Sequence, residues 1–344
     1  MRVLIIGGTG LISTALTRRL VARGESVTVY NRGLRDVPIP ESVEKMTGDR
    51  YDLTAFVPDM RRAGPFDCVV DMITYQPDEA AALVEAFQGR TAHVIFSSTI
   101  DVYQKPAVSY PYADDAPLEG VSHYGKAKAA CERLLLEAHK DRGFPVTIVR
   151  PAHTYGTGGN HRGHVIHSMG KATSFLDRLR KGKPVIVHGD GSSLWASCHL
   201  EDVAAGFAGA VGKPEVAGRC YHLAADECFT WNQYHYRVAE AMGAARPELV
   251  HIPTDILVRV APRRFQLVAE NFQYNNVFDN AAAKQDLGFR QTIPFLDGMR
   301  ETIRWVESEY GFDNCGDDPF YDRLIDAWRR LGGQLAAEFA GLDG

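Results

Sequence analysis

Residues 2–13 read RVLIIGGTGLIS and place a glycine-rich turn between an apolar run and a helical pattern. The run at 2–6 has the continuous apolar character of a buried parallel strand. Small residues after it allow a tight turn and let a pyrophosphate approach the backbone at the positive end of the next helix. Ser13 stands where a third glycine is usual, and it is small enough for close helix packing. The stretch predicts a dinucleotide-binding turn formed by Gly7, Gly8, Thr9, Gly10, Leu11 and Ile12.

The rest of the first two-thirds of the chain repeats this strand–helix alternation. Further strand-like runs lie at 26–30, 67–72, 92–97, 145–149 and 220–224, and helical patterns at 11–23, 78–88, 124–140 and 199–212. Such alternation predicts an α/β fold, a Rossmann-like doubly wound parallel sheet with helices on both faces. From about residue 226 short helical pieces dominate, ending in a pattern at 319–339 that predicts a docked amphipathic helix.

This change in the sequence pattern predicts two regions. Residues 1–165 plus about 197–225 should form the dinucleotide-binding domain. Residues about 166–196 and 226–344 should form a smaller, mainly C-terminal substrate-binding region.

Composition bounds the function. The 344 residues are 45% hydrophobic and 24% charged, as in ordinary globular proteins, and the formal net charge is −5. Because the net charge is negative and no run of basic residues occurs, the protein has no overall electrostatic attraction for nucleic acid. No apolar run approaches the roughly 18 residues of a spanning helix. Met1 leads straight into a strand rather than a signal peptide, and the six cysteines form no CxxC pair. We expect a cytoplasmic protein that binds neither nucleic acid nor membrane.

The end of the second strand bears on cofactor choice. An acidic residue there would bind the adenosine ribose and repel a 2′-phosphate. This chain has Asn31-Arg32-Gly33 instead. The missing carboxylate and the added guanidinium favour NADP slightly over NAD, unless Arg32 is only a solvated loop residue. Further along, Asp49 and Arg50 follow a short apolar run, where a loop touching the adenine is expected.

A catalytic set is expected at the carboxyl edge of the sheet. Tyr124 and Lys128 stand four residues apart at the start of a predicted helix, so their side chains share one face. The ammonium should lower the pKa of the phenol, so that it exchanges a proton near neutral pH. Thr99 lies 25 residues earlier, just after the strand at 92–97. Substrates bind at that edge in open α/β sheets.

In combination these segments resemble the extended short-chain dehydrogenase/reductase family, the NAD-dependent epimerases and dehydratases. The likeness rests on GGTGLIS at 7–13, FSSTIDVY at 96–103, YGKAK at 124–128, RPAHTYG at 150–156 and HLEDVA at 199–204. A looser likeness, through Asn-Arg-Gly after the second strand, is to an atypical subgroup that contains chloroplast stem-loop RNA-binding proteins.

The resemblance implies roles for individual residues. Tyr124 would be the general acid/base, Lys128 would bind the nicotinamide ribose, and Thr99 would hydrogen-bond the reacting oxygen. Ser97, Pro151 and His153 would lie beside the cofactor. The resemblance also implies a homodimer that packs through the helices near 78–88 and 124–140.

Substrate recognition departs from the family pattern. Members that act on nucleotide sugars commonly carry an asparagine and an arginine where this chain has His153 and Trp195. Loss of the arginine removes a charge-assisted bond to a diphosphate. Trp195 either stacks on a sugar or base, or simply packs. His153, His161, His164 and His167 are candidate proton donors or substrate contacts. A metal site is not expected, since no carboxylate or cysteine accompanies them at ligand spacing.

Asp101 separates the functional alternatives. In sugar dehydratases and decarboxylases of the family an acidic residue sits here and removes a proton next to a transient ketone. Alternatively, Asp101 only caps a turn. Three functions remain. The first is an NAD(P)-dependent epimerase/dehydratase-type oxidoreductase that acts on a sugar or nucleotide-sugar-like substrate through a transient keto intermediate. The others are an NADPH-dependent ketoreductase of a small carbonyl compound and a non-catalytic nucleotide- or RNA-binding protein. The intact Thr99, Tyr124 and Lys128 set and the acidic charge argue against the third.

Overall fold

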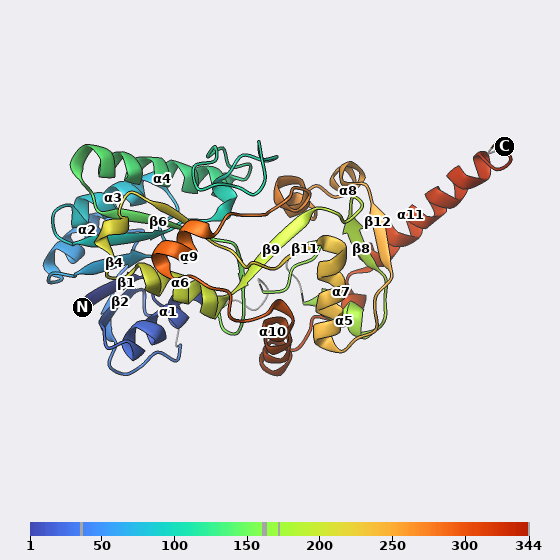
Figure 1. The fold of residues 1–344 in the computed structure, drawn as a ribbon. Helices are drawn as coiled ribbons and strands as arrows, with labels where there is room; N and C mark the ends of the chain where they lie inside the picture. Colours follow the sequence, from blue (N-terminus) through green and yellow to red (C-terminus); the bar gives the residue numbers. More distant parts are fainter. Residues whose placement is uncertain (35–36, 160–163, 171–172, 343–344) are drawn as a thin grey trace. The chain divides into compact units, whose positions relative to one another are not determined.

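The structure, a computed structural model, describes residues 1–34, 37–159, 164–170 and 173–342 (Figure 1). The chain divides into two compact units. Unit 1 comprises residues 1–160, 196–228 and 274–298, and unit 2 comprises 161–195, 229–273 and 299–344. Within the described ranges, no helix combines the length and apolar character needed to cross a membrane.

Unit 1 is built on a seven-stranded parallel sheet, which confirms the predicted α/β class. Its strand order is β10-β6-β5-β4-β1-β2-β3. The order reverses at β1, so the carboxyl ends of β1 and β4 open a crevice of the kind that binds ligands in such sheets. The strands are β1 (Arg2–Ile6), β2 (Ser26–Asn31), β3 (Glu44–Thr47), β4 (Cys68–Asp71), β5 (His93–Ser97), β6 (Val146–Pro151) and β10 (Cys220–Leu223).

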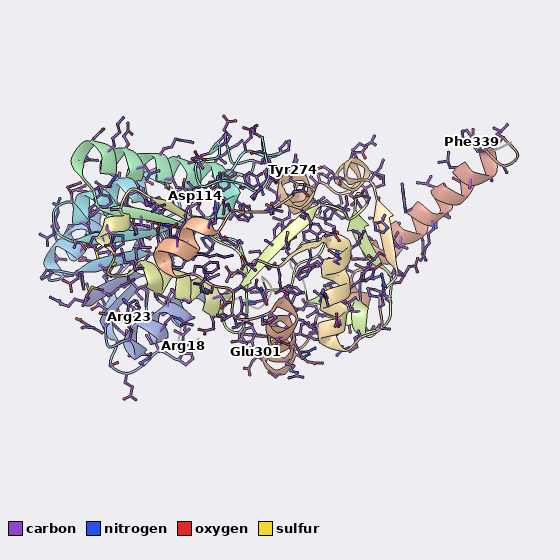
Figure 2. The ribbon with its side chains drawn as sticks, viewed as in Figure 1. Arg18, Arg23, Asp114, Tyr274, Glu301 and Phe339 are labelled. Atoms are coloured by element: carbon purple, nitrogen blue, oxygen red, sulfur yellow. The ribbon has the colours of Figure 1, made fainter. Side chains whose placement is uncertain are left out.

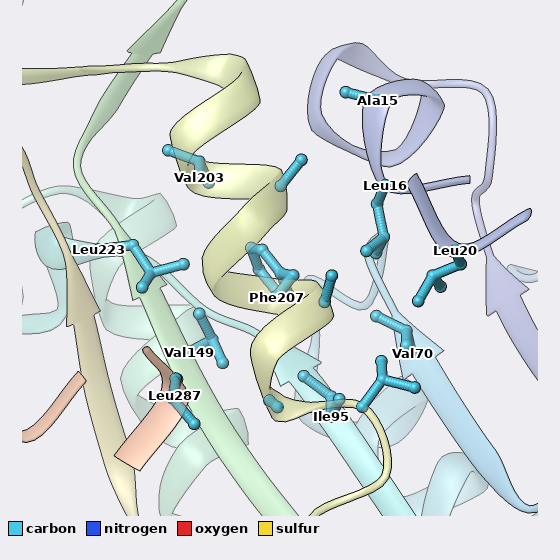
Figure 3. Packing of buried hydrophobic residues seen from close by; sticks show 14 of the residues in the cluster. Ala15, Leu16, Leu20, Val70, Ile95, Val149, Val203, Phe207, Leu223 and Leu287 are labelled. Carbon is cyan, nitrogen blue, oxygen red and sulfur yellow. The ribbon is translucent and has the colours of Figure 1, made fainter. Parts of the chain in front are cut away.

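Helices cover both faces of this sheet because alternate strand residues point to opposite sides. Val3 and Ile5 of β1 join a core with α1 (Leu11–Ala22) and α6 (Leu200–Ala210), whereas Leu4 and Ile6 face the other helices. Figure 3 shows the first core, where Phe207 of α6 packs over the strands. Burying such a ring contributes about 1.5–3 kcal/mol. The opposite face carries α2 (Leu53–Arg62), α3 (Pro77–Phe87) and α4 (His123–Arg142).

Polar contacts tie α1 to α6 at the edge of the first core. Arg18 donates to Glu201 at 3.2 Å, and Arg23 donates to the carbonyls of Ala208 and Val211. Figure 2 labels both arginines. These bonds fix the helix that follows the glycine turn. The remaining elements of unit 1 are short: η1 (Ile100–Val102), β7 (His153–Tyr155), η3 (Pro214–Val216) and α9 (Ala281–Leu287).

Unit 2 has its own aromatic core, in which Trp231 contacts Phe272 with ring centroids 4.5 Å apart. Its elements are α5 (Ser174–Arg180), β8 (Val185–His188), α7 (Trp231–Met242), β12 (Leu249–Ile252), α8 (Thr254–Val260), η4 (Val268–Phe272), η5 (Cys315–Asp317) and α11 (Pro319–Glu338). Three elements run across the sequence boundaries of the units: β9 (Leu194–His199), β11 (Cys228–Thr230) and α10 (Phe295–Glu309).

The last helix differs from the sequence expectation. Leu324 and Ile325 of α11 are buried, as docking requires. Leu331 and Leu335 are exposed, however, and Phe339 just beyond the helix is 58% exposed (Figure 2). The amphipathic stripe is therefore docked only along the first half of the helix, because the second half extends past the elements of its own unit.

Candidate active site

The glycine turn has the geometry that a dinucleotide site needs. Gly7 has a φ of +87°, and a Cβ there would lie 2.5 Å from Ile73. A Cβ on Gly8 would overlap Val29 of β2. Ser13 closes the turn, since its hydroxyl donates to the Gly7 carbonyl at 2.7 Å and accepts the Gly10 N–H at 2.8 Å. The first N–H groups of α1 point out of its N-terminus, where an anion is stabilised.

A cavity of about 260 Å³ adjoins this turn. It brings together the turn, the end of β2 and the loop after β3, as the sequence predicts for a cofactor site. Its lining fits the adenosine end of an NAD-type cofactor. It offers the backbone of the glycine turn, polar side chains at the end of β2 and the rings of Tyr51 and Tyr75. The lining residues are Gly7, Thr9, Gly10, Asn31, Arg32, Leu34, Gly48, Asp49, Arg50, Tyr51, Ile73 and Tyr75.

Arg50 borders this cavity but directs its charge into the protein. Its guanidinium donates to the Thr74 hydroxyl at 2.7 Å and to the Glu79 carbonyl at 2.5 Å, and lies 4.0 Å from the centre of the Phe56 ring. Asp49 accepts the Tyr51 N–H at 3.0 Å. Of the two residues expected at the adenine, Asp49 shapes the loop, and Arg50 anchors the loop to the start of α3.

Lys128 lies in the floor of the site and is 1% exposed. Its ammonium donates to the carbonyls of Thr74, after β4, and Ser97, at the end of β5, both at 2.6 Å. Burial lowers the pKa of Lys128 to about 8, against the opposing effect of the Asp71 charge. The lysine thus joins the carboxyl ends of two strands at the crevice.

Thr99, Asp101 and Tyr124 meet where η1 packs on the start of α4. The Thr99 hydroxyl accepts the Asp101 N–H at 3.2 Å and so begins η1. A Cβ on Gly125 would overlap the Asp101 carbonyl, so glycine is required for this close approach. Ser122 caps α4 by accepting the Gly125 N–H at 2.9 Å. The predicted catalytic residues are therefore held together by backbone packing.

Tyr124 is 41% exposed and borders solvent. Burial around its hydroxyl raises its pKa, as do Asp101 and Tyr75, whereas a hydrogen bond with Thr99 lowers it. This differs from the expectation that Lys128 lowers the pKa of Tyr124. Burial is the largest cause of the raised pKa of Tyr124, and the Lys128 ammonium donates instead to two backbone carbonyls. The phenol is therefore protonated at neutral pH in the chain by itself.

Two further residues of the site carry no local sequence signal. The Lys105 side chain is 2% exposed, and its Nζ lies 3.7 Å from Asp101 Oδ1 and 2.8 Å from Asn276 Oδ1. Burial lowers the pKa of Lys105, and the Asp101 charge opposes that shift. Tyr75 lines the cofactor cavity; its ring centre lies 6.2 Å from that of Tyr124 and 4.9 Å from Lys128 Nζ. Lys105 follows Asp101 by four residues along the chain, whereas only the sheet topology brings Tyr75 to Tyr124 and Lys128.

A buried ionic network supports the site from behind. Glu132, one helical turn after Lys128 on α4, accepts from Ser98 and from Arg150 Nε at 3.0 Å. Arg150 also donates to Tyr103 at 2.5 Å, and Tyr103 bonds His222. The network connects α4 to β5, β6 and β10, so it fixes the strand end that carries Thr99.

Replacing Glu132 by glutamine should lower the free energy of unfolding by about 3–5 kcal/mol, because it leaves a buried guanidinium without its counter-charge. Urea unfolding at pH 7.5 measures the change. The double variant Glu132→Gln/Arg150→Met should recover part of the loss, because it removes the uncompensated charge. If Glu132→Gln lowered the free energy of unfolding by less than about 1 kcal/mol, solvent would have to screen the ion pair between Glu132 and Arg150.

The remaining predicted residues lie in different surroundings. Pro151 ends β6, and His153 Nδ1 lies 3.1 Å from the Ser197 hydroxyl on β9. Trp195 is buried in unit 2 against Trp231 and Phe272, surroundings typical of a packing residue. His164 and His167 are also buried in unit 2, which does not suit a mobile proton donor, and His161 lies outside the described residues.

Comparison with known proteins agrees with this geometry. Residues 3–224 match the sequence model of the NAD dependent epimerase/dehydratase family. The chain is 26% identical over 280 residues to 2'-dehydrokanamycin reductase of Streptomyces kanamyceticus, covering 81% of this chain and 77% of that protein. It is 24% identical over 318 residues to the chloroplast stem-loop binding protein of 41 kDa b of Arabidopsis thaliana, covering 88% and 78%.

Solved structures share the fold. The dTDP-glucose 4,6-dehydratase of Bacillus anthracis, solved in complex with NAD, superposes with a TM-score of 0.70 at 15% identity. The alignment covers 90% of this chain and 97% of that chain. At this identity the likeness concerns the fold alone.

Proposed function

The chain belongs to the NAD-dependent epimerase/dehydratase family, and we propose that it is an NAD(P)-dependent oxidoreductase of the epimerase/dehydratase type. Its substrate would be a sugar or a nucleotide-sugar-like compound that passes through a transient keto form. One observation carries the proposal: Thr99, Asp101 and Tyr124 converge at the carboxyl end of β5, next to Lys128 and the cofactor cavity.

A bound nicotinamide cofactor would supply hydride transfer between a carbinol carbon and the corresponding ketone. The glycine turn and the N-terminus of α1 would hold its pyrophosphate. Lys128 would give up one of its two hydrogen bonds to backbone carbonyls and donate to a ribose hydroxyl instead. Tyr124 would move the proton of the reacting hydroxyl, and Thr99 would donate a hydrogen bond to the same oxygen. Ser97 and Pro151, at the ends of β5 and β6, would border the nicotinamide.

Asp101 would supply the second base that epimerase/dehydratase chemistry requires. Its side chain is 31% exposed, so it can reach a bound molecule, while Lys105 lies buried behind it. In the keto form of the substrate the neighbouring C–H is acidified. The carboxylate takes that proton, and the electron pair of the C–H bond moves into the enolate. The Lys105 ammonium would hold the carboxylate in place.

Asp101→Asn should reduce solvent deuterium exchange into substrate carbon by about 10²- to 10⁴-fold, because the base is lost. Reduction of bound cofactor by substrate should persist, because Tyr124 and Lys128 remain. dTDP-glucose and UDP-glucose in D₂O are the probes, with deuterium measured by mass spectrometry and reduced cofactor by absorbance. The exposed Asp115→Asn serves as a matched control. Absence of exchange in the wild type would remove the carbon-acid proposal, and equal exchange in Asp101→Asn would remove the role of Asp101.

A second candidate is an NADPH-dependent ketoreductase of a carbonyl-bearing small molecule. The likeness to 2'-dehydrokanamycin reductase favours it. A reductase must release its oxidised cofactor each cycle, whereas internal redox cycling needs retention. Cofactor that remains with the purified protein through gel filtration therefore supports the first function, and complete loss supports the second.

The third candidate is a nucleotide- or RNA-binding protein without catalysis. It is supported by the likeness to the chloroplast stem-loop binding protein and by the Asn-Arg-Gly motif. The assembled catalytic residues and the net charge of −5 speak against it. We further propose that unit 2 is the substrate-binding region and that the protein forms a homodimer through α3 and α4.

A further inference from the structure

The second half of α11 has a surface that does not suit exposure to water. Every residue of the segment 331–342 is exposed, and Glu338 carries the only charge of the segment. Gly332 and Gly333 lie in the same stretch of helix, and glycine destabilises a helix interior. A helix of this length gains its stability from packing, so another surface should cover the segment. The large apolar side chains of the segment are 57–73% exposed: Leu331, Leu335, Phe339 and Leu342.

A groove lies between the end of α8 and the first half of α11, within unit 2. Its volume is about 760 Å³. Phe320, Leu324 and Ala327 of α11 form its apolar part together with Val260 of α8, which is 51% exposed. The groove therefore fits an apolar helix that carries a negative charge. Three arginines and two aspartates also line it, so its net charge is positive: Arg264, Arg323, Arg330, Asp318 and Asp326.

The exposed segment and the groove lie on one face of α11. The helix is unbroken as far as Glu338, so the segment cannot fold back into the groove of its own chain (Figure 1). A second copy of the chain has the same groove and can receive the segment there. The face is marked by side chains spaced three or four residues apart: Phe320, Leu324, Ala327, Leu331, Leu335 and Glu338.

An antiparallel arrangement of two α11 helices fills both grooves. With Leu331 at the centre of the contact, the segment of each copy covers the groove of the other, and the contact is isologous. Glu338 of one copy then lies opposite Leu324 of the other, next to the positive charge of Arg323. In a parallel pair the two grooves would stay open, and the two Glu338 carboxylates would lie side by side.

We propose that the segment 331–342 docks reciprocally in the groove between α8 and α11 of a second copy of this chain. Stable protein interfaces bury at least about 1,200 Å² in total, and two segments and two grooves share this area, so each surface contributes about 300 Å². The four apolar side chains of each segment are more than half exposed and can supply that area. The contact uses unit 2 alone and is separate from the homodimer proposed through α3 and α4. Both twofold contacts together would give a tetramer.

Sedimentation velocity of the full chain at micromolar concentration tests the contact. Leu331→Glu should raise the dissociation constant at least about 100-fold and halve the mass of the assembly, because two carboxylates then meet at the centre of the contact. Ala336→Glu adds the same charge at an exposed position outside the apolar face and should leave the mass unchanged. Near-ultraviolet circular dichroism checks that both variants are folded.

A charge exchange tests the antiparallel register. Glu338→Arg and Arg323→Glu should each weaken association roughly 3- to 30-fold, because each variant places like charges across the contact. The double variant should recover the affinity, because opposite charges face each other again. No recovery in the double variant would overturn the antiparallel register.

A wild-type chain that sediments as a monomer would overturn the proposal. A Leu331→Glu variant that keeps the mass of the wild type would do the same, and pairing through α3 and α4 would then account for any dimer. The wild type is also centrifuged with vesicles of phosphatidylcholine and phosphatidylglycerol. Binding to these vesicles that Leu331→Glu abolishes, without a change of mass, would identify a membrane as the occupant instead. Failure of the deuterium experiment would leave the contact between copies unaffected.

Discussion

Replacing Tyr124 by phenylalanine is expected to lower turnover by about 10²- to 10⁴-fold, the contribution typical of a positioned acid/base. Cofactor affinity should change less than about threefold, because only one hydroxyl is removed and the ring still covers Tyr75. Single-turnover reduction of bound cofactor at 340 nm measures the first effect, and calorimetry measures the second. Lys128→Met should impair both quantities, because it removes the buried ammonium that joins the carboxyl ends of β4 and β5.

The pH dependence of the same step follows from the raised pKa of Tyr124. The phenol is protonated at neutral pH, so it is ready to donate a proton but must lose one before it can act as a base. Oxidation of substrate should therefore accelerate as pH rises from 6 to 8 in the wild type, and this dependence should vanish in Tyr124→Phe. Tyr110→Phe, on an exposed tyrosine, is the control. If Tyr124→Phe retained most of the wild-type rate, the catalytic assignment would be wrong.

The sheet could be predicted from sequence because its central strands are buried on both faces. Such strands are short apolar runs between turns, and six of the seven were recognisable in this way. The seventh, β3 with the sequence EKMT, was not, because an edge strand needs no continuous apolar run. Its pairing with β2 follows from tertiary packing.

The site was predictable where the chemistry is local. Tyr124 and Lys128 share a helix, and Thr99 and Asp101 share a turn, so their spacing places them together. The sheet alone brings Tyr75 to Tyr124 and Arg150 to Glu132. The contact between Lys105 and Asp101 is local in sequence, but no motif marks it. Arg50 shows the converse: a charged loop residue suggests ligand contact, yet here its hydrogen bonds go to the protein.

Acidification should unfold the protein steeply between about pH 6.5 and 4. Burial is the main cause that lowers the pKa of His93, His188, His222 and His235 to about 4, and that of His167 to about 3. These side chains are neutral when folded but bind protons once unfolded, below their ordinary pKa of 6.5. Stability is therefore full above pH 6.5 and falls as pH decreases. Asp114 acts oppositely, because burial raises its pKa to about 6.

On unfolding, the five histidines take up about five protons and Asp114 releases one, so the net uptake is about four protons. At about 1.4 kcal/mol per proton and pH unit, the free energy of unfolding should fall by about 5 kcal/mol for each pH unit. Domains of this kind have only about 5–15 kcal/mol in total, so most of the stability should be gone near pH 5. Urea midpoints at pH 7.5, 6.0 and 5.0 measure the slope. His167→Phe keeps an aromatic ring stacked on Phe175 and should reduce the uptake by one proton. A midpoint that does not change from pH 7.5 to 5.0 would mean that these histidines are already protonated, or reach water, in the folded protein.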